Sequence, residues 1–288
     1  MEKRGVVILA VKNEVYGKMA YNLAKSIKLP NENIKVQIIC DEVVREFLGD
    51  KINEFDEITF LSDAYWQSFH PGRIKSNIYS LACFDKNLFI DADSIMVPTA
   101  DIEKLFDELD GRYYQPFNRK MDVKHRSVRS MNGFLLEDLR MEYGDRSERF
   151  YDVNSHFFYF EKNYKVKSFF ESVSESYGEL CVGNSFSDKV KSWRGSVPDE
   201  AAFCLATYKT GLYPSVEQWT PIKDMWEIPG QFNHLNAATL LIDNMGVTMN
   251  ANDPNLEKFY DYVCIIIKIK YNCFLYSWSE INEERMKL

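Results

Sequence analysis

Residues 88–97 read LFIDADSIMV, in which an Asp-x-Asp sequence separates two short apolar segments. Leu88–Ile90 is typical of a buried strand, and Ile95–Val97 is expected to continue it after a break. On an extended strand Asp91 and Asp93 occupy positions i and i+2, so their carboxylates point the same way. Two unpaired anions at the end of a buried strand would be costly, which favours a divalent cation holding a phosphate. The alternative is that one Asp caps a helix or that both face water in a loop.

The residues before this stretch alternate between strand and helix patterns. Val6–Val11 is a continuous apolar run, typical of a strand covered on both faces, and apolar positions from Tyr16 to Ile27 recur with helical spacing. Further strands are expected at Val36–Cys40 and Ile58–Leu61, with helical patterns at residues 43–48 and 74–82. This alternation predicts a parallel α/β sheet with helices on both faces, in which ligands bind beyond the carboxyl ends of the strands.

The rest of the chain shows no repeat, linker or low-complexity tract. Helices are expected around residues 102–109, 169–177 and 201–206, and strands at 113–116 and 157–160. The apolar segment Val263–Trp278, interrupted by Lys268 and Lys270, is expected to be a buried closing element. A surface that leans on a bilayer is the alternative. These patterns predict a single domain.

Composition narrows the functional classes. The chain has 288 residues, of which 45% are apolar and 15% aromatic, so it can bury a sizeable core. A formal charge of -8 argues against a general nucleic-acid binder. The six cysteines lack C-x-x-C spacing, which argues against a zinc site or a disulfide framework. The chain contains neither an uncharged run of about 18 apolar residues nor a signal-peptide pattern, so a cytoplasmic location is expected. Peripheral association with a membrane surface is the alternative.

Four segments carry a resemblance to a known family. They are Ile8–Tyr16, Arg73–Lys75 together with Asp85–Asp93, Asp152–Ser155, and Pro198–Glu200. They resemble the GT-A glycosyltransferases, and within them the retaining group (glycosyltransferase family 8) that includes glycogenin and the bacterial lipooligosaccharide galactosyltransferases. The resemblance implies a Rossmann-like, mostly parallel sheet and metal-dependent transfer of a hexose from a nucleotide-sugar, expected to be a UDP-sugar, with retention.

The resemblance also implies roles for individual residues. The implied donor-binding residues are Ala10, Asn13, Tyr16, Arg73, Lys75, Ala92 and Asp93. The implied ligands of Mn²⁺ or Mg²⁺ are Asp91, Asp93 and His234, with His156 and His125 as alternatives to His234. The implied catalytic residues are Asp199, Glu200 and Asn154. We expect a nucleotide-binding half at residues 1–110, a donor and acceptor half at 111–240, and a C-terminal helical or irregular appendage at 241–288.

The chain departs from the family pattern at several positions. Ser155 and His156 stand where the family has Ala-Gly, and Glu200 stands where it has Gln. His234 is not followed by the family's Lys-Pro-Trp sequence. A carboxylate at Glu200 can stabilise positive charge, act as a nucleophile, or serve as a base. Capping of a helix by Asp199 and a strand-end turn at Asn154 are the structural alternatives for these two residues.

Other functions compete with this interpretation. A haloacid-dehalogenase-like phosphatase also places Asp-x-Asp after a strand, but Ile95 and the lack of a second downstream acidic motif argue against it. A catalytically inactive sugar-nucleotide-binding protein is the alternative from a different class. The sequence does not determine whether the acceptor is a glycan, a lipid-linked sugar, a protein or a small molecule. The oligomeric state also stays open.

Overall fold

The computed structural model describes residues 2–62, 69–120, 134–145, 150–182, 198–216, 218–219, 221, 246–248 and 254–285. The chain divides into two compact units. The first unit comprises Met1–Gln67, Asn87–Leu109 and Pro221–Leu288, and the second comprises Ser68–Lys86 and Asp110–Thr220. The division at residues 110 and 240 that the sequence suggested stays a prediction.

The first unit is built on a parallel sheet. Its strands are β1 (Arg4–Ala10), β2 (Lys35–Cys40), β3 (Glu57–Phe60) and β4 (Lys86–Ile90), in the spatial order β3-β2-β1-β4. β1 pairs in parallel with β2, and β2 with β3, so that Ile8 lies opposite Ile38 and Ile38 lies opposite Ile58. Ile8 and Ile38 are completely buried, as expected for strands covered on both faces.

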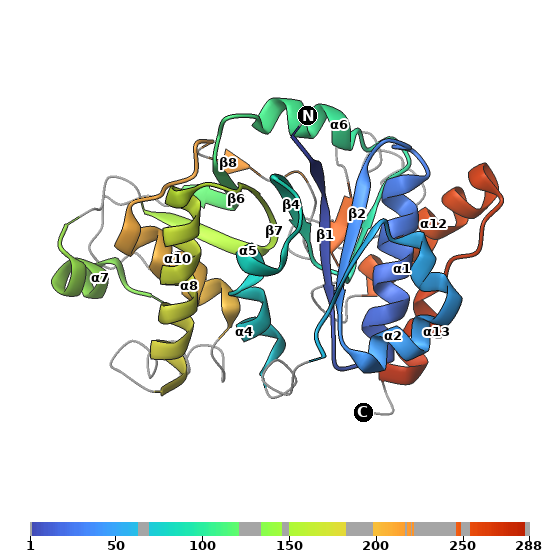
Figure 1. Cartoon of the computed structure of the whole chain (residues 1–288), viewed down its shortest axis with the longest axis horizontal. Helices are drawn as coiled ribbons and strands as arrows, with labels where there is room; N and C mark the ends of the chain where they lie inside the picture. Colours follow the sequence, from blue (N-terminus) through green and yellow to red (C-terminus); the bar gives the residue numbers. More distant parts are fainter. Residues whose placement is uncertain are drawn as a thin grey trace. The chain divides into compact units, whose positions relative to one another are not determined.

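Helices of the first unit pack against this sheet and against one another. They are α1 (Glu14–Lys28), α2 (Glu42–Leu48), the short 3-10 helix η1 (Gly49–Glu54), α6 (Ile102–Leu109), α12 (Pro254–Tyr271) and α13 (Trp278–Arg285). Figure 1 shows α2 and α13 beside α1. α1 begins where the Asn13 side chain accepts a hydrogen bond from the backbone N–H of Val15, an ordinary N-cap.

The predicted closing element near the C-terminus is confirmed in part. Val263 and Ile267 on α12 are completely buried, whereas Ile265 and Ile269 on its other side are 51% and 79% exposed. Hydrogen bonds attach this segment and the residues after it to α1: the Asn22 amide donates to the carbonyl of Tyr276 at 2.7 Å, and Lys18 Nζ donates to that of Glu280 at 2.8 Å. The segment therefore belongs to the core of the first unit.

The prediction for Ile95–Val97 was wrong in one respect. β5 (Ser94–Met96) does not extend β4, but pairs antiparallel with β9 (Gly246–Thr248) in a separate two-stranded sheet. The backbone N–H of Ser94 donates to the carbonyl of Asp91 at 3.0 Å, which closes a tight turn between the two strands. This turn redirects the chain at the Asp-x-Asp sequence.

The second unit combines a short antiparallel sheet with several helices. Its strands are β6 (Tyr114–Lys120), β7 (Tyr151–Glu161) and β8 (Gln218–Trp219), in the order β7-β6-β8, and its helices are α4 (Pro71–Lys75), α5 (Ile78–Leu81), α7 (Leu136–Tyr143), α8 (Tyr164–Val182) and α10 (Asp199–Thr210). The strands predicted at 113–116 and 157–160 exist but are longer. Rings of Phe158, Phe170 and Phe203 meet between β7, α8 and α10 and form much of the core.

The helix predicted at 74–82 is two short helices. α4 ends at Lys75, and α5 starts after Asn77, whose backbone lies at φ -103° and ψ 13°. The Asn77 side chain donates to the carbonyl of Arg73 at 2.9 Å and so takes an acceptor that a continuing helix would use.

The predicted fold class is confirmed: an α/β fold with a mostly parallel, Rossmann-like sheet and helices on both faces. None of the helices in the described part of the chain is both long and apolar enough to span a membrane.

Candidate active site

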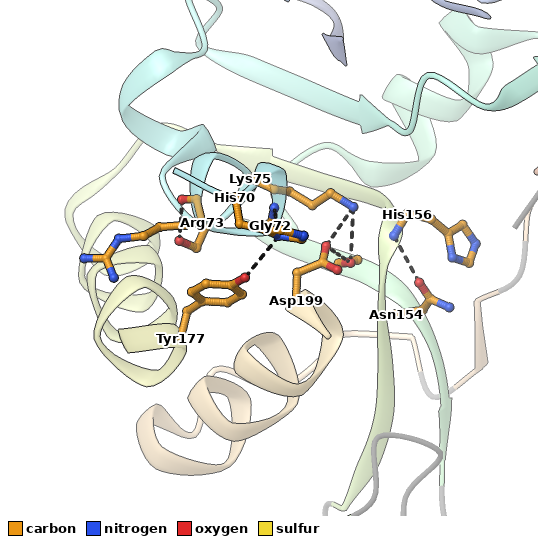
Figure 2. Close-up of polar contacts among 10 residues, drawn as sticks. His70, Gly72, Arg73, Lys75, Asn154, His156, Tyr177 and Asp199 are labelled. Carbon is orange, nitrogen blue, oxygen red and sulfur yellow. Dashed lines mark hydrogen bonds and ion pairs between the residues drawn. The ribbon is translucent and has the colours of Figure 1, made fainter. Parts of the chain in front are cut away.

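Three of the flagged segments meet in the second unit at one buried ion pair. Figure 2 shows the side chains of Lys75 and Asp199 pointing toward each other, from α4 and from the first residue of α10. Lys75 Nζ lies 2.8 Å from Asp199 Oδ2. The Ser155 hydroxyl on β7 donates to the same oxygen at 2.7 Å, and Lys75 Nζ lies 3.5 Å from Ser155 Oγ. Lys75, Asp199 and Ser155 are called the Asp199 cluster below.

The cluster keeps Asp199 ionised. Burial alone raises the pKa of this carboxyl group, but the Lys75 ammonium and the hydrogen bonds from Lys75 and Ser155 outweigh burial and lower the pKa to about 2. Glu200, the next residue of α10, also contributes to the low pKa of Asp199. The site therefore presents a buried anion at the start of α10, where the helix dipole also favours negative charge.

The capping alternative for Asp199 is excluded. The N-cap of α10 is Pro198, and no side chain caps this helix. Asp199 instead occupies the first helical position and is turned toward α4. Its role in the fold is to pair with Lys75, which is itself only 9% exposed. Lys75 is therefore a buried charge and not a surface one.

The position of α4 depends on contacts around Gly72. The backbone N–H of Gly72 donates to His70 Nδ1 at 3.2 Å, and the Tyr177 hydroxyl on α8 lies 3.3 Å from the same nitrogen (Figure 2). Because that nitrogen accepts from Gly72, Tyr177 is the donor in the second contact. Burial, followed by Cys181 and Asp199, raises the pKa of Tyr177, which keeps its hydroxyl protonated. A Cβ on Gly72 would lie 3.0 Å from the Tyr177 hydroxyl oxygen and 3.3 Å from Asp199 Cβ, so only glycine fits without a shift.

Three other flagged residues of the second unit lie around this cluster. The Arg73 guanidinium is half-buried and stands 4.8 Å from the ring centroid of Phe69. Asn154 precedes Ser155 on β7, and its Oδ1 accepts from the backbone N–H of His156 at 3.1 Å. The His156 ring is buried and packs 4.5 Å from the Phe117 ring. The strand-end alternative for Asn154 is wrong, since this residue lies inside β7.

The Asp-x-Asp sequence lies in the first unit. Asp91 and Asp93 are half-buried and flank the buried Ala92, in the turn that joins β4 to β5. The expectation that they share one extended strand was wrong, because the backbone turns at Ala92–Asp93. Among the described residues, no group of three His, Cys, Asp or Glu side chains is placed to hold a metal.

The residues expected to bind the nucleotide follow β1, the strand next to β4. Ala10 is buried at the end of β1, Asn13 caps α1, and the Tyr16 side chain is 41% exposed. Between them Lys12 has a positive φ of 74°, and its backbone N–H donates to Asp41 Oδ2 at 2.7 Å. Asp41 also caps α2, so one carboxylate holds the turn after β1 and the start of α2.

Several functional contacts were missed from the sequence. Ser155 was noted only as a departure from the family pattern, although its alternation with Asn154 on a strand places it on the opposite face. Asp41 directly follows the buried strand β2, as Asp91 follows β4. This position would have marked Asp41 as a candidate from the sequence. His234 and His125 lie outside the described residues, so the predictions about them are untested.

The chain resembles several solved structures of glycosyltransferases. No protein-family model and no curated protein matches the chain. The apo form of the bifunctional glycosyltransferase WbbM aligns with 94% of this chain and 52% of its own, with a TM-score of 0.57 at 14% identity. Apo mouse xyloside xylosyltransferase 1 aligns with 87% of this chain and 99% of its own, with a TM-score of 0.51 at 14% identity.

A third similar structure is the apo form of the glycosyltransferase GlyE of Streptococcus pneumoniae TIGR4. It aligns with 99% of this chain and 64% of its own, with a TM-score of 0.51 at 14% identity. This chain therefore spans about half the length of WbbM and 64% of GlyE. At such low identity the likeness concerns the fold, and the chain has the GT-A glycosyltransferase fold.

Proposed function

We propose that the protein is a metal-dependent glycosyltransferase that moves a hexose from a nucleotide-sugar, preferentially a UDP-sugar, to an acceptor with retention. The observation that carries the proposal is the Asp199 cluster, a buried and ionised carboxylate in a chain with the GT-A fold. A carboxylate has about four acceptor positions, and Lys75 and Ser155 take two of them at Oδ2. The remaining capacity suits hydroxyl groups of a donor sugar.

The metal motif fits a divalent cation that is held partly by its substrate. Mg²⁺ is commonly bound by one or two carboxylates plus substrate phosphates, and Mn²⁺ accepts the same hard oxygen ligands. Asp91 and Asp93 supply two half-buried carboxylates. When bound, the cation would neutralise charge that builds on the departing diphosphate, an effect worth several kcal/mol.

The remaining residues have roles in orienting the donor. Asn13 and the exposed Tyr16 ring follow β1 and would hold the nucleoside, with Ala10 lining the strand end. Arg73 would add positive charge toward the diphosphate or the sugar, and Asn154 would orient the sugar ring. In this proposal residues 1–110 bind the nucleotide, residues 111–240 bind the sugar and the acceptor, and His234 is the third metal ligand.

Glu200 replaces the family's amide at the start of α10. Glu200 follows Asp199 in the first turn of α10, next to the buried anion. We therefore assign Glu200 to the reactive face of the donor, where it would stabilise positive charge at the anomeric carbon.

A donor screen tests the proposal. UDP- and GDP-sugars are incubated with the protein and Mn²⁺, nucleoside diphosphate release is measured before and after chelation, and the anomeric configuration of the product is read by NMR. We expect metal-dependent release from a UDP-hexose, lost in Asp199→Asn. Asp110→Asn is the matched control, since Asp110 is also paired with a lysine, Lys86, but is 60% exposed.

The screen also distinguishes the transferase from an inactive binding protein and from a phosphatase. Thermal stabilisation by UDP and Mn²⁺ without turnover of any donor would favour an inactive sugar-nucleotide-binding protein. Phosphate release from a phosphomonoester would favour the phosphatase. Either result would contradict the proposed transferase activity.

A further inference from the structure

The side of α12 that is turned away from the core of the first unit exposes large apolar side chains. Ile265 is 51% exposed and Ile269 is 79% exposed, whereas Ile267 on the opposite side is completely buried. Single exposed apolar residues are ordinary, but neighbouring ones on one helix face mark an interaction surface. Four residues spaced i, i+4, i+7 and i+11 form this face: Lys258, Tyr262, Ile265 and Ile269.

The chain after α12 adds a third exposed apolar side chain. α12 ends at Tyr271, and Asn272 has a positive φ of 47°, a conformation that asparagine tolerates and that often ends a helix. After this turn Phe274, which is 48% exposed, lies against α12, with Lys268 Nζ 6.0 Å from the centroid of its ring. Lys51 Nζ on η1 lies 5.0 Å from the same centroid. The α12 surface, as it is called below, comprises three apolar and three basic residues: Ile265, Ile269, Phe274, Lys51, Lys268 and Lys270.

The α12 surface is basic although the whole chain carries a formal charge of -8. Residues 258–274 contain three lysines and one acidic residue, Asp261. The Asp261 carboxylate accepts a hydrogen bond from the backbone N–H of Trp278 at 2.5 Å, and the Glu280 carboxylate accepts one from the backbone N–H of Ser277 at 2.7 Å. Both carboxylates therefore hold the start of α13, and the α12 surface itself carries a net positive charge.

This combination of side chains fits an anionic lipid bilayer. Aliphatic and aromatic side chains on one helix face enter the boundary between headgroups and acyl chains, and lysines beside them keep their ammonium groups at the level of the lipid phosphates. The lysines favour anionic over neutral membranes. A second copy of this chain fits less well, because the three exposed apolar side chains offer roughly 300 Å². A stable dimer needs about 800 Å² from each partner.

We propose that the α12 surface binds an anionic bilayer, with its three apolar side chains in the membrane interface and its three lysines at the lipid phosphates. The contact is peripheral, so that α12 lies on the membrane and does not cross it. The sequence left burial in the core and contact with a bilayer as alternatives for Val263–Trp278, and on this account the two sides of α12 do one each. The inference does not rest on the proposed transferase activity, because membrane binding needs neither donor nor metal.

Sedimentation with vesicles tests the proposal. The whole chain is mixed with vesicles of phosphatidylcholine alone, or with vesicles of equimolar phosphatidylcholine and phosphatidylserine. We expect binding to the mixed vesicles that weakens as salt is added, and little binding to phosphatidylcholine alone. Lys270→Gln should weaken binding about fivefold, the usual contribution of one lysine near an anionic surface. Ile269→Gln should weaken it about tenfold or more, because a large apolar side chain no longer enters the interface.

Two matched controls lie elsewhere on the surface. Met141 on α7 is 74% exposed, and the Lys104 side chain on α6 is 72% exposed. Met141→Gln and Lys104→Gln should bind the mixed vesicles as the wild type does. All four positions are exposed, so the variants should fold, which circular dichroism verifies.

Three outcomes would overturn the inference. The first is a wild type that does not bind the mixed vesicles, or binds both kinds of vesicle equally. The second is unchanged binding in a folded Ile269→Gln or Lys270→Gln protein. The third is self-association in analytical ultracentrifugation that Ile269→Gln abolishes, without vesicle binding, which would make a second copy of the chain the occupant of the α12 surface. None of these outcomes bears on donor turnover, which the donor screen measures separately.

Discussion

Lys75 Nζ and Asp199 Oδ2 lie 2.8 Å apart, with their side chains 11% and 19% exposed. A pair this buried pays a large desolvation cost, and it is retained in proteins chiefly where its geometry and its extra hydrogen bonds are good. Here Ser155 supplies the extra hydrogen bond. The pair therefore fixes how α4 and α10 face each other in the second unit, and it fixes the direction of the carboxylate that we assign to the donor sugar.

Replacement of Lys75 by Met should be strongly destabilising. The variant leaves Asp199 buried without its cation, which typically costs about 3–5 kcal/mol. Urea unfolding at neutral pH measures this loss. The double variant Lys75→Met/Asp199→Leu removes both charges, and we expect it to recover most of the lost stability. A double variant as unstable as the single one would show that the contact is not a coupled ion pair.

The pH dependence of the unfolding free energy should reflect the low pKa of Asp199. Its pKa is about 2 in the folded chain, below the usual value of about 3.9 for an unfolded Asp. The folded pKa is the lower one, so the stabilisation is complete above about pH 5 and is lost progressively as the pH falls toward 1, a change of about 2–3 kcal/mol. The difference in unfolding free energy between wild type and Lys75→Met should shrink over this interval.

Lys104→Met is the control for that pH series. Lys104 and Glu108 form an i,i+4 pair whose side chains are 72% and 60% exposed. Exposed pairs of this kind contribute little to stability. The Lys104→Met protein should therefore follow the wild-type curve throughout. A pH-independent gap between wild type and Lys75→Met would contradict the assignment of the low pKa to Asp199.

Replacement of Ser155 by Ala should have a moderate effect. The hydroxyl is completely buried and donates to an ionised carboxylate, and such hydrogen bonds contribute about 1.5–3 kcal/mol. We expect a loss of stability in that range, with donor turnover reduced but present, because Lys75 still holds Asp199. Differential scanning calorimetry and nucleotide release measure the two effects. An unchanged melting temperature would show that Ser155 does not support the carboxylate.

Glycines 72 and 178 should respond to alanine in opposite directions. At Gly72 a Cβ would crowd Tyr177 and Asp199, and overpacking of this kind costs about 1–3 kcal/mol. At Gly178 on α8 the nearest atom to a new Cβ is Arg73 Nη1 at 3.8 Å, an ordinary contact. Gly178→Ala should therefore stabilise the chain by up to about 1 kcal/mol, because alanine is the better helix former. Equal effects of the two changes would refute the tight packing at Gly72.

Local patterns predicted the fold better than they predicted the site. Buried strands such as Val36–Cys40 and the helix from Tyr16 to Ile27 are visible because their periodicities differ and each is set by near neighbours. Asn77 broke the helix expected at 74–82 through a single side-chain hydrogen bond, a competition that apolar spacing does not reveal.

The site depends on contacts between distant residues. Lys75, Asn154 and Asp199 were each identified as candidates, but the pairing of Lys75 with Asp199 exists only because α4, β7 and α10 pack together. The turn at Asp91–Asp93 was missed for a similar reason. An apolar run after an Asp-x-Asp sequence fits a continuing strand, and only the pairing of β5 with β9 shows that it leaves the sheet.

Nucleoside diphosphate release by wild type and by Asp93→Asn tests the central claim most directly. Both proteins are assayed with UDP-hexoses, with Mn²⁺ and after chelation, and their melting temperatures are compared. We predict metal-dependent release by the wild type, and loss of that release in Asp93→Asn at an unchanged melting temperature. Undiminished Mn²⁺-dependent release by a folded Asp93→Asn protein would contradict a metal-assisted transferase site at the turn between β4 and β5.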